Sequence, residues 1–139
     1  MPERQPTAEQ LRAFRDHPRA GPIQMINLLK FRDRAEYSAP NDENADVSGQ
    51  EAYGRYGAAV SQIVAGLGGR IVWSGTPETV FIGNDGDEWD AVAIVEYPSR
   101  AVFLSMIAMP EYHAAHVHRD AGLSHQKLIQ CRHGGDALS

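Results

Sequence analysis

The chain has 139 residues, of which 42% are hydrophobic, and its 18 acidic and 13 basic residues give a formal net charge of −5. This length and apolar content suit one domain with one core. The acidic balance argues against nucleic acid or an anionic membrane as the main partner, because both are polyanions. The sequence has no apolar run of about 18 residues and no apolar signal core among its first ten residues, so we expect no membrane span and no secretion. Its single cysteine, Cys131, lies in an apolar run and predicts a buried, reduced thiol in a cytoplasmic protein.

The first 20 residues predict a helical appendage to the main fold. Thr7 and Gln10 have the spacing of a capping box, in which each side chain bonds the other residue's backbone N–H. Apolar residues three apart then indicate a short amphipathic helix over residues 8 to 16. We expect residues 1–20 to lie outside the core of the domain.

The next segment predicts a strand followed by a long loop. Ile23 to Phe31 places apolar residues on both faces of an extended chain, which indicates a strand covered on both sides. Residues 32 to 48 are polar and include the turn-forming run Pro40, Asn41 and Asp42. A loop of this length is uncommon, and we interpret it as a mobile or functional segment.

A second capping pattern, Ser48 with Glu51, begins the best-defined helix, and Gly68 and Gly69 end it. The helix is indicated by apolar residues at three- and four-residue steps, which are Tyr53, Tyr56, Val60, Ile63, Val64 and Leu67. A strand over 70–74 follows, and we expect it to resume over 79–82 after a bend at 75–77.

The remaining residues predict a turn, two strands and two helices. The run at 83–87 is rich in Gly, Asn and Asp and indicates a turn, after which Trp89 to Tyr97 forms a strand. Ser99 caps a helix, and Pro110 begins a second, short one that extends to about Val117. Gln126 to Arg132 forms the last strand.

Without the first helix, the order is strand, helix, strand, strand, helix, strand. Two such crossovers onto one antiparallel sheet give an α+β ferredoxin-like βαββαβ sandwich, here over residues 23–132 of a single domain spanning 1–139. The helices of that fold cover one face of the sheet, whereas the strands are apolar on both faces. Packing the second face against another copy would bury it, which predicts a homodimer.

Three short motifs, in their order and spacing, resemble the family called domain of unknown function 1330, within the dimeric α/β-barrel group of ferredoxin-like proteins. They are Gly68-Gly69-Arg70, Glu96-Tyr97-Pro98-Ser99, and Pro110-Glu111-Tyr112 with Arg119. The resemblance implies a dimeric α/β barrel made of two sheets, one per subunit, and often a pocket between sheet and helices. Its wider group includes cofactor-free oxygenases, haem-using enzymes, isomerases, dehalogenases and plain ligand binders, so the fold does not define the chemistry.

Several polar residues on apolar faces are candidates for a site. Glu96 shares a strand face with Val92 and Ile94, and we interpret it either as an acid/base catalyst or as one half of a structural ion pair, with Arg119 as a partner. The other catalytic candidate is His113, because a histidine in a pocket exchanges protons near neutral pH. Candidates for substrate binding are Asn27, Tyr53, Tyr56, Trp73 and Arg119. Each also has a structural interpretation, as a satisfied amide, a core aromatic or an ion pair.

The histidine-rich run after Tyr112 raises the question of a metal. His113, His116 and His118 lie close to Asp120 and His125, but the HxxHxH spacing matches no established zinc motif. We therefore expect no metal and no cofactor.

Together these residues predict a protein that acts on a small organic molecule in a pocket between sheet and helices. The leading hypothesis is a cofactor-independent enzyme that uses acid/base proton transfer, in which Arg119 neutralises an anion and Asn27 and Tyr56 orient the substrate. One alternative is a non-catalytic dimeric module for ligand binding or interaction. A further alternative is a haem-binding or monooxygenase-type member of the dimeric α/β-barrel group.

Overall fold

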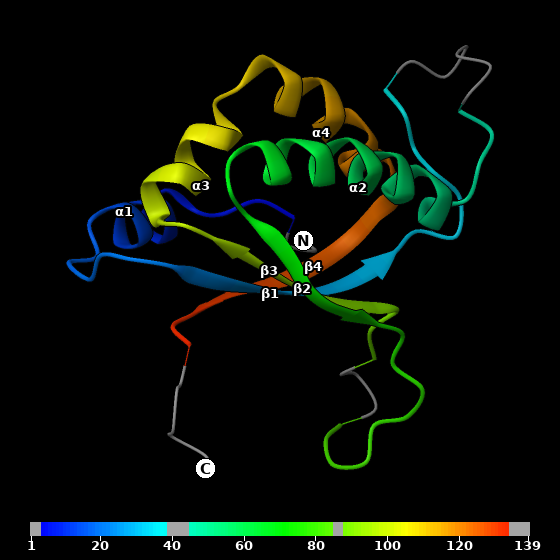
Figure 1. Ribbon diagram of the computed structural model, residues 1–139. Coiled ribbons are helices and arrows are strands. Elements are labelled where there is room, and N and C mark those ends of the chain that lie inside the picture. The colour runs from blue at the N-terminus through cyan, green and yellow to red at the C-terminus, as the bar shows by residue number, and fades with distance from the viewer. Residues whose placement is uncertain (1–3, 39–44, 85–87, 134–139) are drawn as a thin grey trace.

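A computed structural model describes residues 4–38, 45–84 and 88–133, and Figure 1 shows one layer of helices on one face of a sheet. The strands are β1 (Ile23–Phe31), β2 (Arg70–Gly75), β3 (Ala91–Tyr97) and β4 (Leu123–Cys131). The helices are α1 (Ala8–Arg15), α2 (Gly49–Gly66), α3 (Arg100–Ile107) and α4 (Pro110–Gly122). The strand order is β2-β3-β1-β4 with every neighbouring pair antiparallel, which confirms the ferredoxin-like fold with an extra N-terminal helix.

The predicted capping residues begin the helices. The Thr7 hydroxyl accepts from the amide of Gln10, whose side chain accepts from the amide of Thr7, so this capping box is complete. The hydroxyls of Ser48 and Ser99 cap α2 and α3 by accepting from the backbone N–H of the third residue of each helix. Gly68 follows α2 with φ +84°, a backbone conformation that a side chain would disfavour.

Strand alternation divides β1 between the two faces of the sheet. Met25 points toward the helices and is buried, while Ile26 and Leu28 point to the outer face and are half-buried. The core lies between the helical face and helices α2 to α4 and contains Ile23, Met25, Val60, Val64, Tyr97, Met106, Tyr112 and Ala115. Cys131, expected to be buried, is half-buried.

The outer face of the sheet carries apolar side chains that no layer of the described residues covers. The register pairs Ile26 with Ile94 and with Ile129, and Trp73 with Ile94, so these side chains share one face. Trp73 is 55% exposed, which corrects the interpretation of this residue as core. All four helices lie on the other side (Figure 1).

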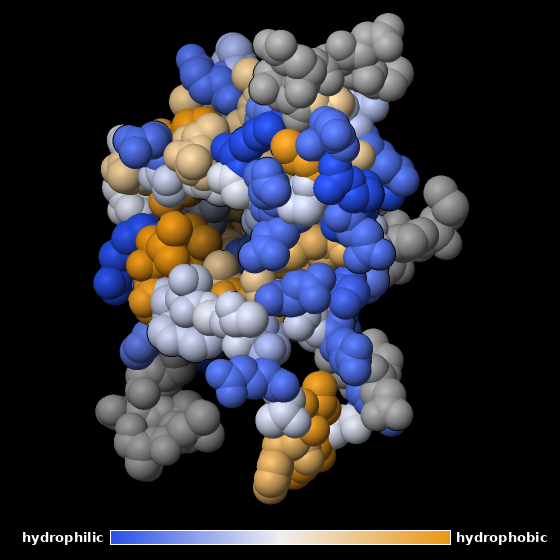
Figure 2. Space-filling model, turned by 90° about the vertical axis from the view of Figure 1, so that its right-hand side faces the viewer, coloured by the Kyte–Doolittle hydropathy of each residue, from blue (hydrophilic) through white to orange (hydrophobic). Residues whose placement is uncertain are grey.

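The predicted return strand over 79–82 is wrong. β2 ends at Gly75, and the segment that follows projects from the outer side of the sheet and ends in exposed apolar residues, with Phe81 93% exposed. Figure 2 shows this segment as an apolar protrusion below the body. Its sequence has the residue types of a strand, but strand structure also needs a partner strand, and among the described residues these have none. Part of the predicted turn, residues 85–87, lies outside the described residues.

Two boundaries differ for a related reason. α4 continues to Gly122 rather than ending near Val117, and β4 then begins at Leu123 without a connecting loop. The additional turns of α4 are fixed by tertiary contacts that no local pattern reveals.

The described ends of the 32–48 segment pair with each other, through the amide of Ala35 and the carbonyl of Val47 at 2.9 Å.

A close backbone contact joins α2, α4 and the end of β1. The amide of Arg32 donates to the carbonyl of Gly122 at 2.8 Å. A Cβ atom at Gly122 would lie 2.3 Å from the carbonyl oxygen of Gly49 and 2.7 Å from the backbone nitrogen of Tyr53. The contact therefore requires glycine, since neither neighbour is a side chain that can move aside.

We expect Gly122→Ala to lower the free energy of unfolding by about 1–3 kcal/mol, because the added methyl group forces the two helices apart. Gly54→Ala is the matched control, since a Cβ there meets nothing within 4 Å. It should raise the free energy of unfolding by about 0.5–1 kcal/mol through helix propensity. Urea denaturation measures both, and equal effects of the two substitutions would contradict the close-contact argument.

Candidate functional site

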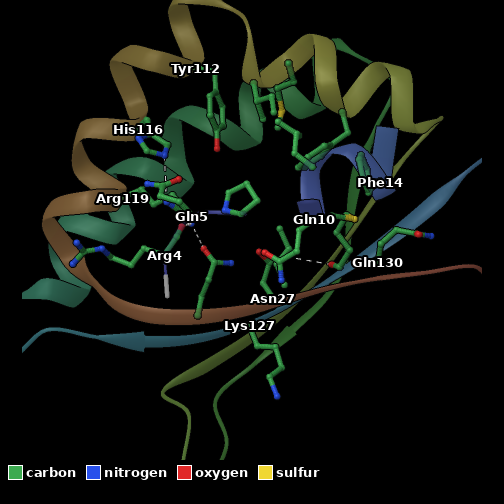
Figure 3. A pocket seen from close by; sticks show the side chains of 18 of the residues that line it. Arg4, Gln5, Gln10, Phe14, Asn27, Tyr112, His116, Arg119, Lys127 and Gln130 are labelled. Carbon is green, nitrogen blue, oxygen red and sulfur yellow. Dashed lines mark hydrogen bonds between the residues drawn. The ribbon is translucent and has the colours of Figure 1, made fainter. Parts of the chain in front are cut away.

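A cavity of about 700 Å³ lies between the helical face of the sheet and the helices. Figure 3 shows His116, Arg119 and Arg4 at one end of it and Phe14 at the other. Side chains of β1, α2, α3 and α4 form its walls, and α1 with the preceding residues 4–7 adds a further wall. The N-terminal helix, predicted as an appendage, is therefore part of the candidate site.

The apolar wall comes mainly from α1 and α3. The ring of Phe14 packs edge-on against Phe103 with centroids 5.4 Å apart, and the guanidinium of Arg100 lies 5.6 Å from the centre of the Phe14 ring. Leu11, Met106 and Ile107 complete this end of the cavity. The lining side chains at this end are uncharged and offer a ligand dispersion contacts, and Arg100 itself does not line the cavity.

Three tyrosines line the opposite wall. Tyr53 and Tyr56 come from α2, one turn apart on the same face, and Tyr112 comes from α4 with its hydroxyl pointing into the cavity (Figure 3). The hydroxyls of Tyr56 and Tyr112 are 3.0 Å apart. Burial raises the pKa of Tyr53 to about 12 and that of Tyr56 well above its ordinary value. Both phenols are therefore neutral near pH 7 and can donate hydrogen bonds.

His116 and Arg119 form a charged junction on α4. A guanidinium only donates, so its Nη1, 3.2 Å from His116 Nε2, defines that nitrogen as an acceptor. The proton of His116 is then on Nδ1, which lies 3.2 Å from Asp120 Oδ2. Burial lowers the pKa of His116, an effect that Asp120 opposes and Arg119 strengthens. His116 is accordingly neutral near pH 7.

The same arginine holds the N-terminal segment. Nη2 of Arg119 donates to the carbonyl of Arg4 and to Oε1 of Gln126 on β4. Beside it, Nε2 of Gln5 donates to Oδ1 of Asp120 at 3.0 Å. Residues 4 and 5 are thus attached to α4 beside the cavity.

Asn27 lies on the floor of the cavity, on the central strand. Its Nδ2 donates to the carbonyls of Met25 and Ala93, at 3.2 and 3.3 Å. These two bonds satisfy the amide nitrogen through its own strand and the neighbouring one. They also fix the side chain, whose carbonyl oxygen can still accept a hydrogen bond.

The structure brings five of the seven predicted site residues together, namely Asn27, Tyr53, Tyr56, His113 and Arg119. His113 lies on the exposed side of α4 at the edge of the cavity. Among the described residues, its imidazole has ring contact with Tyr112 and no hydrogen-bonding partner.

The other two candidates, Glu96 and Trp73, lie on the outer face of the sheet. The carboxylate of Glu96 accepts from Gln24 at 2.8 Å and from Arg70 at 3.3 Å, so the predicted partner Arg119 is wrong. The hydrogen bonds from Gln24 and Arg70 lower the pKa of Glu96. Glu96 is therefore a surface ion-pair residue of this chain and does not reach the cavity.

Sequence reasoning missed Tyr112, His116 and the segment 4–7 as parts of the site. A signal existed for two of them. Tyr112 belongs to the motif Pro110-Glu111-Tyr112, and His116 lies three residues before Arg119, which makes the two neighbours on one helix face. No sequence signal indicates that residues 4–7 reach α4, since this contact spans 115 residues.

Within the described ranges, no three His, Cys, Asp or Glu residues gather as a metal site. The search of the same residues for a helix long and apolar enough to cross a membrane found none.

Comparison with known proteins identifies the family. The chain matches, over residues 43–130, a family described as a domain of unknown function (DUF1330). The chain belongs to this family. RPA0582, a protein of unknown function from Rhodopseudomonas palustris, is 39% identical over 94% of this chain and 96% of its own, and the TM-score is 0.86. None of the curated proteins matches.

A more distant similarity is to a dimeric protein of unknown function from Bacteroides fragilis, described as having a ferredoxin-like fold. It is 17% identical over 80% of this chain and 95% of its own, and the TM-score is 0.50. At this identity the likeness concerns the fold alone. The family and the fold expected from the sequence motifs are both confirmed.

The junction on α4 predicts an unusual titration of His116. Its protonation should occur below the pKa of about 6.5 of an exposed histidine, because burial favours the neutral ring. Asp120→Asn should lower this pKa further, since the carboxylate is the group that raises it. NMR of the ¹⁵N-labelled imidazole measures the pKa and the Nδ1–H tautomer. A proton on Nε2, or a pKa that rises in Asp120→Asn, would contradict the assigned geometry.

Proposed function

We propose that this protein is a cytoplasmic domain that binds a small organic molecule in the cavity between the sheet and the helices. The observation that supports it is the cavity itself, whose volume of about 700 Å³ lies within the range of small-molecule sites. Its walls combine an apolar end with a few oriented polar groups, the pattern of such sites. The proposal needs no bound cofactor.

We also propose that the protein is a homodimer that pairs through the outer face of its sheet. Ile26, Ile94 and Ile129 lie side by side there, and Trp73 stands beside them with more than half of its surface exposed. Burying such a face against the same face of a second copy stabilises both copies. The dimeric description of the Bacteroides fragilis neighbour is consistent with this pairing.

Acid/base catalysis by His113 is a second candidate function. The imidazole lies at the cavity edge, and of the two predicted acid/base residues it alone lines the cavity. His116 is less suited, because its acceptor nitrogen already bonds Arg119. A proton carrier needs a free nitrogen within reach of the ligand, and His113 supplies one.

Native mass spectrometry tests binding and assembly together. The protein is incubated with a small-molecule extract of its expression host, freed of excess solutes and weighed. We expect a dimer that retains a small adduct, because the cavity holds a small organic molecule and the outer face holds a second copy. The cavity-filling variant Ile107→Trp should lose the adduct and keep the dimer, while an adduct that persists in this variant would place binding outside the cavity.

Two lysine substitutions separate the faces of the molecule. Ile129, on the outer face of the sheet, is 41% exposed, and Val117, on the helical side, is 51% exposed. Neither substitution should disturb the core. Ile129→Lys should convert the dimer to a monomer, whereas Val117→Lys should leave it intact. A dimer in both variants would overturn the proposed interface.

Hydrogen–deuterium exchange at the bound molecule tests the proposed proton transfer. Once the adduct is identified, it is incubated with the protein in D₂O, and exchange at its most acidic C–H position is followed by NMR. Catalysis predicts exchange that falls about a hundredfold in His113→Ala and stays unchanged in His118→Ala, a histidine that does not line the cavity. Exchange at the uncatalysed rate in the unaltered protein would leave binding as the function and rule out this chemistry for that ligand.

A further inference from the structure

We infer that the ligand of this cavity is an organic acid, an anionic head group on an apolar body. This inference rests on the proposed binding function and specifies its ligand. The chain as a whole is acidic, with 18 acidic residues. Yet among the described residues, no Asp or Glu lines the cavity, and the permanently charged side chains that do are Arg4, Arg119 and Lys127.

Arg119 is the cation best placed to meet an anion. Its side chain is buried beside the cavity and is held in position by Gln126 and by the carbonyl of Arg4. Lys127 belongs to the same wall, but its amine points away, beneath the sheet (Figure 3). The positive charge of the site therefore comes mainly from the buried guanidinium. Its Nη1 and Nη2 already donate to protein groups, so it attracts an anion through its charge.

The nearest carboxylate to this guanidinium does not cancel its effect in the cavity. Asp120 Oδ1 lies 3.5 Å from Arg119 Nη1, and the side chain of Asp120 is 47% exposed. Water screens that carboxylate strongly, whereas the enclosed side of the guanidinium is screened less. An anion entering the cavity would meet a net attraction from this end.

Neutral hydrogen-bond donors strengthen the preference for an anion. The hydroxyls of Tyr53, Tyr56 and Tyr112 line the cavity, and those of Tyr53 and Tyr56 stay protonated near pH 7. Tyr56 and Tyr112 share one hydrogen bond, so Tyr53 and one member of this pair can donate to a carboxylate oxygen. A cationic ligand would lack any lining carboxylate among the described residues and would have to approach a buried guanidinium.

The rest of the cavity defines the ligand body. The end formed by Phe14, Phe103 and Ile107 has no charged group and two aromatic rings. An aliphatic or aromatic body would displace water from these surfaces, which favours binding. The two ends together select a molecule that is anionic at one end and apolar at the other.

A matched pair of fluorescent dyes tests the inference. 8-Anilinonaphthalene-1-sulfonate carries an anionic sulfonate, and N-phenyl-1-naphthylamine has the same aromatic body without the charge. We expect the intact protein to bind the anion at least about tenfold more tightly, which corresponds to about 1.4 kcal/mol. Binding of both dyes should disappear in the cavity-filling variant Ile107→Trp.

Charge variants locate the preference. Arg119→Met should lower the affinity for the sulfonate about tenfold and leave that for the neutral dye within about twofold, a range set by one buried charge-assisted contact. Arg119→Lys keeps the charge and should retain most of the preference, which separates the charge from the structural role of the arginine. Arg12→Met removes an exposed charge of α1 that does not line the cavity and should change neither affinity. Circular dichroism confirms that each variant is folded, and Arg4→Gln replaces Arg119→Met if that variant unfolds.

The outcomes distinguish the two proposals. Equal or tighter binding of the neutral dye in the cavity would overturn the organic-acid inference and leave the binding function standing. Binding of both dyes that survives in Ile107→Trp would place them outside the cavity and count against the binding function itself. If Arg119→Met and Arg12→Met lose the preference for the sulfonate equally, the preference belongs to general surface charge, and the inference is also overturned.

Discussion

The close approach of Gly49 and Gly122 determines how the two main helices lie over the sheet. Because neither residue has a side chain, the start of α2 and the end of α4 come into backbone contact, and Arg32 at the end of β1 bonds the same point. Tyr53, Tyr56 and Tyr112 and the charged junction of the cavity extend from these two helices. The spacing of Tyr53 and Tyr56 from Tyr112 and Arg119 therefore depends on a contact that contains no polar side chain of the site.

Two buried arginines attach the N-terminal residues to this framework in the same manner. Arg119 donates to the carbonyl of Arg4 and to Gln126, while Arg100 donates to the carbonyl of Arg19 and to Gln130. Each joins the segment around α1 to a glutamine of β4. A charged group buried with well-placed acceptors is costly to leave unpaired, so the two junctions hold α1 at both ends. They convert an amphipathic helix of eight residues, too short to be stable alone, into one wall of the cavity.

The local patterns of the chain predicted its elements well and its surfaces less well. Alternation over Ile23–Phe31 gave the bounds of β1, and the caps at Thr7, Ser48 and Ser99 gave the starts of three helices. Alternation also placed Glu96 correctly with Val92 and Ile94, but a period of two cannot say which face meets the helices. That choice is made by packing over the whole sheet, and it put Glu96 outside and Asn27 inside. The protrusion at 79–82 lacks a partner strand among the described residues, and the contact between Arg4 and Arg119 spans 115 residues. Neither can be read from a local window of sequence.

The cavity is lined by two parts of the chain, and only one of them lies within the family match. The match to the DUF1330 family covers residues 43–130, which supply the tyrosines and the charged junction, while Leu11, Phe14, Met25 and Asn27 precede it. Substitutions in this earlier part can reshape the apolar wall and leave the family-defining residues unaltered. The size of molecule that this cavity admits therefore depends partly on residues outside the segment that defines the family.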